Sequence, residues 1–294
     1  MSTRSLEAGG PHRILWMSDL SPRAAACGPM VRWLAGLSTA SGDPAEVVVA
    51  CGLGTEDGDE ARAHRQQALG EIAALAGDLE SVGVAARPVV ARTGALELAR
   101  TLIDEHDIDL VVCGRHGHGG LTRALMGSTA RRFLRELGLP VLVVHHGEAL
   151  APRRLLCPIE LEPLDADAPS LTEVSARGLR VAAALARRSG ARLTVAWVAA
   201  SPGPFAEEGP DARQQLDAET RRILLETPEG EAGLSWGSRL VRSEDVVASL
   251  VDTARQADLV VLGTAGRRGL QRLGAQSVAE ALLEHAPSHV LVAR

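Results

Sequence analysis

The stretch Gly114–Thr129, GRHGHGGLTRALMGST, combines glycines and hydroxyl residues in an order that suits the binding of phosphate groups. Gly114 and Gly117 directly follow an apolar run. A glycine has no Cβ to hold an anion away from backbone N–H groups, and it permits positive φ. Gly127–Thr129 then stands where a helix is expected to begin, and the unpaired N–H groups and dipole of a helix N-terminus attract anions. The spacing Gly-x2-Gly-x9-Gly-Ser therefore predicts a two-sided cradle for a polyphosphate. The simpler alternative is that the glycines only turn the chain and Ser128 only caps the helix.

An acidic residue, Asp19, stands at the expected end of the first strand, in the run ILWMSDLSP. In open α/β sheets, ligands bind at the carboxyl ends of the strands, where the strand order reverses. The first and fourth strands are neighbours in such a sheet, so this carboxylate can accept hydrogen bonds from ribose hydroxyls beside the glycine stretch. The alternative is that Asp19 caps the helix that begins near Pro22.

The cradle needs a strand before it and a helix after it, and the hydrophobic pattern of the first half predicts both. Short apolar runs alternate with longer segments of helical apolar spacing. The runs do not alternate polar and apolar residues, which is typical of a parallel sheet covered by helices on both faces. The expected strands are Ile14–Met17, Val47–Cys51, Arg87–Ala91, Leu110–Cys113 and Val141–Val144, and the expected helices are Arg23–Leu37, Glu60–Leu79, Ala95–Glu105 and Ser128–Leu137.

The chain contains this pattern twice. DLVVCGRHGHGGL at Asp109–Leu121 recurs as DLVVLGTAGRRGL at Asp258–Leu270, 149 residues later. RILWMSDLSP at Arg13–Pro22 resembles RLLCPIELEP at Arg154–Pro163, 141 residues later, which indicates a net insertion in the second half. The fold class expected is α/β, as two tandem open α/β/α sandwich domains of Rossmann-like type. They cover residues 1–148 and 152–294, and each has a five-stranded parallel sheet.

Composition excludes several classes of function. The net charge of −6 provides no basic field for a nucleic-acid backbone. All 31 basic residues are arginine, which excludes mechanisms that need a lysine, such as the phosphate lysine of the Walker A loop. The four cysteines have no CxxC spacing, so buried, reduced thiols are expected. Because the sequence shows neither an apolar signal segment nor a membrane-spanning run, we expect a cytoplasmic protein that binds neither membrane nor nucleic acid.

In these motifs the chain resembles the universal stress protein family in its tandem form, over nearly its whole length. The family has an α/β fold with five parallel strands, and its ATP-binding members hold the nucleotide at the glycine motif. The resemblance implies ATP, with or without Mg²⁺, as the cofactor of the first half. It implies phosphate contacts from the glycines and hydroxyls, a ribose or metal contact from Asp19, and an adenine pocket edged by Ala50. The binding residues so implied are Asp19, Ala50, Cys113, Gly114, His116, Gly117, Gly127, Ser128 and Thr129.

The family also uses its last strands for dimer contacts. The corresponding runs here are Val141–Val144 and Val290–Ala293. The resemblance therefore implies that the two halves pair within one chain, with a homodimer as the alternative.

The second half departs from the glycine motif. Gly263, Gly266 and Ser277 are kept, but Gln276 stands at the third glycine position and Glu160 replaces the aspartate. A glutamine side chain occupies space where a phosphate would approach, and it disfavours any positive φ needed there. We expect this half to bind nucleotide weakly or not at all and to act as an internal partner of the first.

Two other constellations are weaker. The histidines at positions 116, 118, 145 and 146 lack the spacing of a zinc site. The run Gly233–Gly237 fits GxSxG with Ser235 as nucleophile, but a loop precedes it and a strand-like run follows, the reverse of a nucleophile elbow. No catalytic or metal-binding residue is therefore predicted.

The leading hypothesis is a nucleotide-binding regulatory protein of the stress response. One alternative is an enzyme that slowly hydrolyses ATP or transfers its phosphate, with Asp19 as its metal-binding carboxylate. The other is a structural or dimerisation module in which the motif binds nothing.

Overall fold

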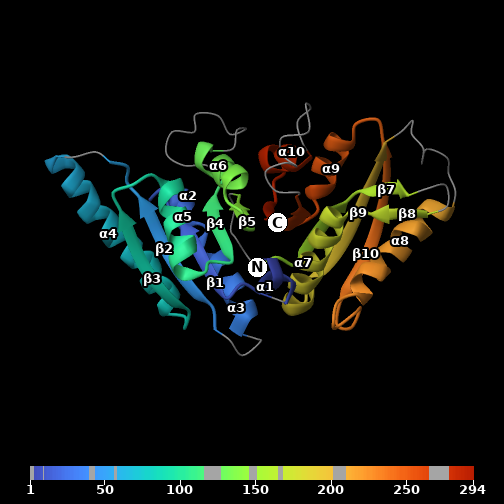
Figure 1. Cartoon of the computed structure of the whole chain (residues 1–294), viewed down its shortest axis with the longest axis horizontal. Coiled ribbons are helices and arrows are strands. Elements are labelled where there is room, and N and C mark those ends of the chain that lie inside the picture. Colours follow the sequence, from blue (N-terminus) through green and yellow to red (C-terminus); the bar gives the residue numbers. More distant parts are fainter. Residues whose placement is uncertain are drawn as a thin grey trace. The chain divides into compact units, whose positions relative to one another are not determined.

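A computed structural model of the chain describes residues 3–8, 10–39, 44–55, 58–115, 127–145, 151–164, 168–200, 210–264 and 278–294. The chain divides into two compact units, Met1–Ala151 and Pro152–Arg294 (Figure 1). Each unit has five parallel strands with helices packed against them, which confirms the fold class expected from the sequence.

In the first unit the strand order is β5-β4-β1-β2-β3. The order reverses at β1, which pairs with β2 on one side and β4 on the other. Helices α3 and α4 contact each other, as do α5 and α6, so each pair covers one face, as right-handed crossovers require. The elements are α1 Thr3–Glu7, β1 Arg13–Met17, α2 Pro22–Ala25, α3 Gly28–Thr39, β2 Glu46–Gly52, α4 Asp59–Glu80, β3 Ala85–Ala91, α5 Ala95–His106, β4 Leu110–Gly114, α6 Ser128–Glu136 and β5 Val141–Val144.

These bounds agree with the sequence prediction to within about two residues, except that the helix expected over Arg23–Leu37 is two helices, α2 and α3. Proline lacks the N–H that a helix interior needs but fits the first turn of a helix. Pro29 therefore suits a new helix that begins at Gly28.

The second unit repeats this order as β10-β9-β6-β11-β12. Helices α7 and α8 contact each other, and so do α9 and α10. An antiparallel hairpin, β7–β8, directly follows β6, within the stretch where the sequence offset indicates an insertion. The elements are β6 Arg154–Ile159, β7 Leu161–Leu164, β8 Ala168–Leu171, α7 Glu173–Ser189, β9 Arg192–Ala200, α8 Pro210–Leu225, β10 Ser235–Ser243, α9 Val246–Ala254, β11 Leu259–Gly263, α10 Val278–His285 and β12 His289–Ala293.

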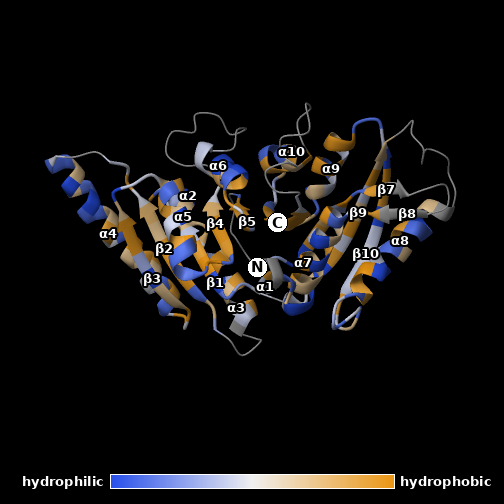
Figure 2. Cartoon of the chain, viewed as in Figure 1, coloured by the Kyte–Doolittle hydropathy of each residue, from blue (hydrophilic) through white to orange (hydrophobic). Residues whose placement is uncertain are grey.

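The core of each unit is built on its central strands. Figure 2 shows β1, β2 and β4 as mostly hydrophobic ribbons, while the outer helix α4 alternates between hydrophilic and hydrophobic positions. Every residue of β4 up to Cys113 is buried, with Gly114 half-buried at its end. This rigid, apolar strand therefore ends at the first residue of the glycine stretch.

Candidate functional site

The exit of β4 and the start of α6 are held together by backbone hydrogen bonds. The N–H of Arg115 donates to the carbonyl of Val144, at 3.0 Å. The N–H of Gly127 donates to the carbonyl of Arg115, at 2.8 Å. The chain between, with the predicted site residues His116 and Gly117, lies outside the described residues. Both sides of the predicted cradle thus begin at one point on the sheet edge.

The N-terminus of α6 offers donors to a ligand. Its cap residue, Gly127, has no side chain to accept a hydrogen bond. Within the described part of the chain, the N–H groups of Ser128, Thr129 and Ala130 have no hydrogen-bond partner. Ser128 and Thr129 are exposed, so their hydroxyls are also accessible. Unpaired N–H groups at the positive end of a helix dipole favour an anion such as phosphate.

Helices α4 and α5, like α6, begin after a glycine that provides no side-chain cap, whereas α7 and α9 are capped. The side chain of Thr172 accepts from Ser175 N–H at the start of α7, and that of Asp245 accepts from Ala248 N–H at the start of α9. Helix α6 differs from α4 and α5 in having Ser128 and Thr129 as its first two residues, so hydroxyl groups stand beside its uncapped N–H groups.

Ser128 is the first residue of α6 and not its cap, so the simpler alternative for this residue is wrong. Gly127 has φ −58° and ψ 148°, a conformation open to any residue, so the site needs no positive φ there. At the matching position of the second half, Gln276 is therefore expected to hinder a phosphate only through the space that its side chain fills.

Asp19 lies beside the end of β4, as the strand order predicts. Met17, the last residue of β1, pairs with Cys113 of β4. Asp19 is exposed, and its Oδ1 accepts from the N–H of Ser21 at 3.1 Å and from the Ser21 hydroxyl at 2.6 Å. Ser21, and not Asp19, caps α2 by accepting from the N–H of Ala24. Asp19 thus orients the capping residue while its carboxylate remains at the sheet edge.

The backbone next to Asp19 is strained. Leu20 has φ +63°, which a non-glycine residue with a branched side chain rarely adopts. Its N–H donates to the Ser18 hydroxyl at 3.1 Å, and the Ser18 N–H donates to the carbonyl of Ala50 at 2.8 Å. Such strain persists only where neighbouring contacts hold it, and it is concentrated at functional sites.

Ala50 itself lies within β2 between Met17 and Val89 of the flanking strands. Its side chain is fully buried. In this structure Ala50 therefore supports the loop that carries Asp19 through its carbonyl, and its methyl group belongs to the core.

The charge of Asp19 acts on three buried thiols, those of Cys27, Cys51 and Cys113. Burial raises the pKa of Cys113 to about 12 and that of Cys51 to about 11, and the Asp19 charge adds to both shifts. Burial also raises the pKa of Cys27, with further contributions from Cys113 and Asp19. All four cysteines are free and buried, which confirms the expectation of reduced core thiols. Cys113 and its neighbours are neutral at physiological pH and are not nucleophiles.

The sequence profile of the universal stress protein family matches the chain twice, over residues 17–145 and 168–294. The chain belongs to the universal stress protein family. The match covers both halves, so the chain is a tandem member with two universal stress domains.

Mycobacterial relatives are similar to this tandem chain. A universal stress protein of Mycobacterium tuberculosis is 31% identical over 200 residues, which span 64% of this chain and 63% of the relative. One of Mycolicibacterium smegmatis is 32% identical over 206 residues, 67% of this chain and 66% of the relative. The alignment thus spans somewhat less than two thirds of the length of these relatives.

Solved structures share the fold of the whole chain. A universal stress protein of Archaeoglobus fulgidus has a TM-score of 0.68 at 16% identity, covering 96% of this chain and 98% of that one. A putative universal stress protein of Pseudomonas aeruginosa has a TM-score of 0.61 at 19% identity, with coverages of 98% and 94%. At these identities the likeness concerns the fold alone.

In the second universal stress domain, the retained Gly263 has a packing role. A Cβ on Gly263 would lie 1.8 Å from the carbonyl oxygen of Val174 in α7, and one on Gly178 would lie 2.6 Å from the N of Gly263. Helix α7 thus crosses the end of β11 in backbone contact. Keeping this glycine therefore says nothing about phosphate binding, while Gly266, Gln276 and Ser277 lie outside the described residues.

The loop after the first strand also differs between the domains. Glu160, which replaces Asp19, is exposed, and its N–H donates to the Ser175 hydroxyl at 2.9 Å. The β7–β8 hairpin follows it where the first domain has its strained loop. Weak or absent nucleotide binding by the second domain stays a prediction.

Sequence reasoning missed two aspartates that anchor the first strand of each domain. Asp109 accepts from the N–H groups of His12 at 2.9 Å and Arg13 at 3.2 Å. Asp258 accepts from those of Arg153 and Arg154, both at 2.9 Å. Burial raises the pKa of Asp109 although these bonds oppose the shift. The sequence contained a signal for this shared role, because each aspartate is the first residue of one copy of the repeated DLVV segment.

Ser235 is the first residue of β10, so the GxSxG match leads into a strand and not into a helix. No three His, Cys, Asp or Glu side chains in the described ranges come together as a metal site. No helix among those same residues has the length and apolar character to span a membrane.

Proposed function

We propose that the first universal stress domain binds ATP or a related adenine nucleotide, and that the chain acts as a regulatory protein of the stress response. The observation that carries the proposal is the start of α6, beside the end of β4, where three consecutive N–H groups have no partner among the residues that the structure describes. Donors arranged in this way fit the oxygens of a phosphate chain.

Asp19 supports a nucleotide over a simple phosphate. Its carboxylate lies at the end of β1, next to β4, where the sheet order reverses. This is the edge at which open α/β sheets bind ligands. A ribose hydroxyl can donate to this carboxylate while the phosphates accept from α6. Family membership supports the link to stress responses.

A regulatory role fits the chemistry of the site better than catalysis does. The chain has no lysine, and the thiols beside Asp19 are neutral. A ligand that binds one arrangement of the protein more tightly shifts its population toward that arrangement, and this is sufficient for regulation. Sedimentation of the chain with and without nucleotide measures whether the shift affects self-association.

Calorimetric titration of ATP and Mg²⁺ into the full chain tests the proposal. In the Ser128→Pro variant one N–H donor is lost, but proline fits the first helical position, and the conformation of Gly127 already suits the residue before a proline. Ser128→Ala removes only the hydroxyl. Glu173→Pro is the matched control, because α7 begins in the same way after Thr172, with φ −59° and ψ 148°.

We expect the Ser128→Pro variant to bind ATP about 10 to 100 times more weakly, the effect of losing a hydrogen bond to a charged group. Ser128→Ala should have a smaller effect, and Glu173→Pro none. Gly127→Gln, which copies Gln276, should abolish binding by filling the site. The native chain must first be freed of co-purified nucleotide. If ATP then fails to bind it, or binds all variants equally, the proposal is wrong.

A further inference from the structure

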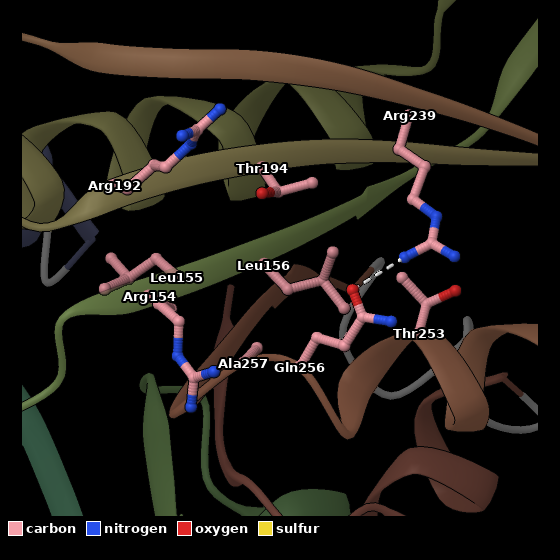
Figure 3. Close-up of a pocket in the computed structure, with 9 residues that line it drawn as sticks. All are labelled: Arg154, Leu155, Leu156, Arg192, Thr194, Arg239, Thr253, Gln256 and Ala257. Carbon is pink, nitrogen blue, oxygen red and sulfur yellow. Dashed lines mark hydrogen bonds between the residues drawn. The ribbon is translucent and has the colours of Figure 1, made fainter.

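A cavity of about 280 Å³ lies in the second unit, away from the sheet edge described above (Figure 3). It is formed by the first residues of β6 and β9, by Arg239 of β10, and by the C-terminal end of α9. Its floor is at the amino-terminal ends of β6 and β9, whereas Gly263 marks the carboxyl end of β11. The cavity therefore differs in place from a nucleotide site of the family's type.

We propose that this cavity binds a small phosphorylated organic molecule. Its lining contains three arginines, Arg154, Arg192 and Arg239, and no acidic residue. The planar guanidinium fork matches the oxygens of a phosphate, and a hollow lined by one sign of charge concentrates the opposite sign. This lining stands out in a chain with a net charge of −6.

The three arginines are not equivalent. Arg154 is neutralised by Asp258, with Nη2 to Oδ1 at 2.6 Å. Arg239 donates from Nη1 to the neutral Oε1 of Gln256 at 3.0 Å, the contact dashed in Figure 3. Arg192 makes no ion pair within the described ranges of the chain. Two positive charges at the rim are therefore left without an acidic partner among these residues.

The rest of the cavity selects for an organic body on the anion. Leu156 is buried in its floor on the same face of the sheet as Arg154 and Thr194, and Ala257 adds a further apolar surface. Figure 3 shows Thr194 above Leu156, between Arg192 and Arg239. The volume is near the lower end of the range for small-molecule sites, about 300 to 1,000 Å³. A phosphate with a compact apolar group fits both the rim and the floor.

The fold itself does not require this charge pattern. In the first unit, the residue paired with the start of β1 is Glu46, whereas Arg192 is paired with the start of β6. Val89 is the fifth residue of β3 in the first unit, and Arg239 is the fifth residue of β10, the corresponding strand of the second unit. An acid and an aliphatic side chain thus occupy the places of the two uncompensated arginines, so the cationic cavity is particular to the second unit.

Calorimetry or ligand-observed NMR on the full chain, with phenyl phosphate as the probe at low ionic strength, tests the proposal. Binding of inorganic phosphate measures the contribution of the arginines without an apolar group on the ligand. Binding of benzoate shows whether a carboxylate can replace the phosphate. The variants are Arg239→Gln and the double variant Arg192→Glu, Arg239→Val, which copies the first unit. Arg213→Gln, an exposed position on α8, is the control for the loss of one charge.

We expect phenyl phosphate to bind more tightly than inorganic phosphate or benzoate. Arg239→Gln should weaken binding at least about tenfold, as expected for a charged hydrogen bond, and the double variant should abolish it. Arg213→Gln and Ser128→Pro should bind as the native chain does. Absence of binding overturns the proposal, as does equal binding by Arg239→Gln. Loss of binding in the Ser128→Pro variant would assign the probe to the nucleotide site and also overturn it.

Discussion

Gly263→Ala is the substitution whose effect the structure specifies most sharply. The added Cβ would lie 1.8 Å from the Val174 carbonyl oxygen and 2.7 Å from its carbonyl carbon. Ordinary contacts of this kind begin near 3.4 Å. Helix α7 would therefore have to move away from β11 by roughly 1.5 Å, and neither partner is a flexible side chain that can give way.

The cost follows from what α7 buries. Most of its residues from Ser175 to Ala186 are buried against the sheet, so a shift of the helix disturbs the core of the second unit. Overpacking a core costs about 1–3 kcal/mol even when side chains can adjust. We expect a loss of about 3 kcal/mol or more, which for a domain of this size lowers Tm by roughly 10 °C.

Urea unfolding followed by far-UV circular dichroism measures this loss, and hydrogen exchange of peptides from α7 assigns it to the second unit. Gly237→Ala is the matched control in the same unit, because its Cβ would meet only the end of the Arg192 side chain, at 3.9 Å. It should stay within about 0.5 kcal/mol of the native chain. If Gly263→Ala proves as mild as this control, close packing does not explain the glycine.

Two predictions concern pH. Burial lowers the pKa of His289 to about 4 from 6.5, against the opposing charge of Asp258. The unfolded chain then binds a proton between these pH values that the folded chain does not, so stability should fall as the pH drops from 6.5 to 4. The fall should reach about 3 kcal/mol, and His289→Gln should flatten it in urea titrations at several pH values. Burial raises the pKa of Asp258, but hydrogen bonds from Arg154 and the neighbouring N–H groups outweigh it and lower the pKa overall. Its contribution is thus present above the unfolded pKa and lost as the pH falls through the folded one. Asp258→Asn should cost about 1 kcal/mol at neutral pH, with the difference from the native chain closing in acid. A constant difference at all pH values would contradict this assignment.

The sequence by itself determined the elements, the repeat and the family. Apolar runs such as Leu110–Cys113 and helical spacing such as Ala95–Glu105 are local patterns, and local patterns decide which segments form strands and helices. The exceptions were the break of one predicted helix at Gly28, for which Pro29 was the available signal, and the short helix α1 and hairpin β7–β8, which were not predicted. Two copies of one pattern then implied two copies of one sheet.

Tertiary structure alone decided what the glycines do. Gly127 and Gly263 look alike as members of one motif, yet the first leaves helix N–H groups without a cap and the second allows a helix to touch a strand. These roles depend on which backbone lies opposite each glycine. That neighbour is far away in the sequence.

The arginine cavity has the same origin. Arg154, Arg192 and Arg239 belong to three separate strands, and nothing in their spacing connects them. They line one cavity because parallel pairing places the start of β6 beside β9, and β9 beside β10. A charge pattern across strands arises from register, and register is set by the packing of the whole sheet.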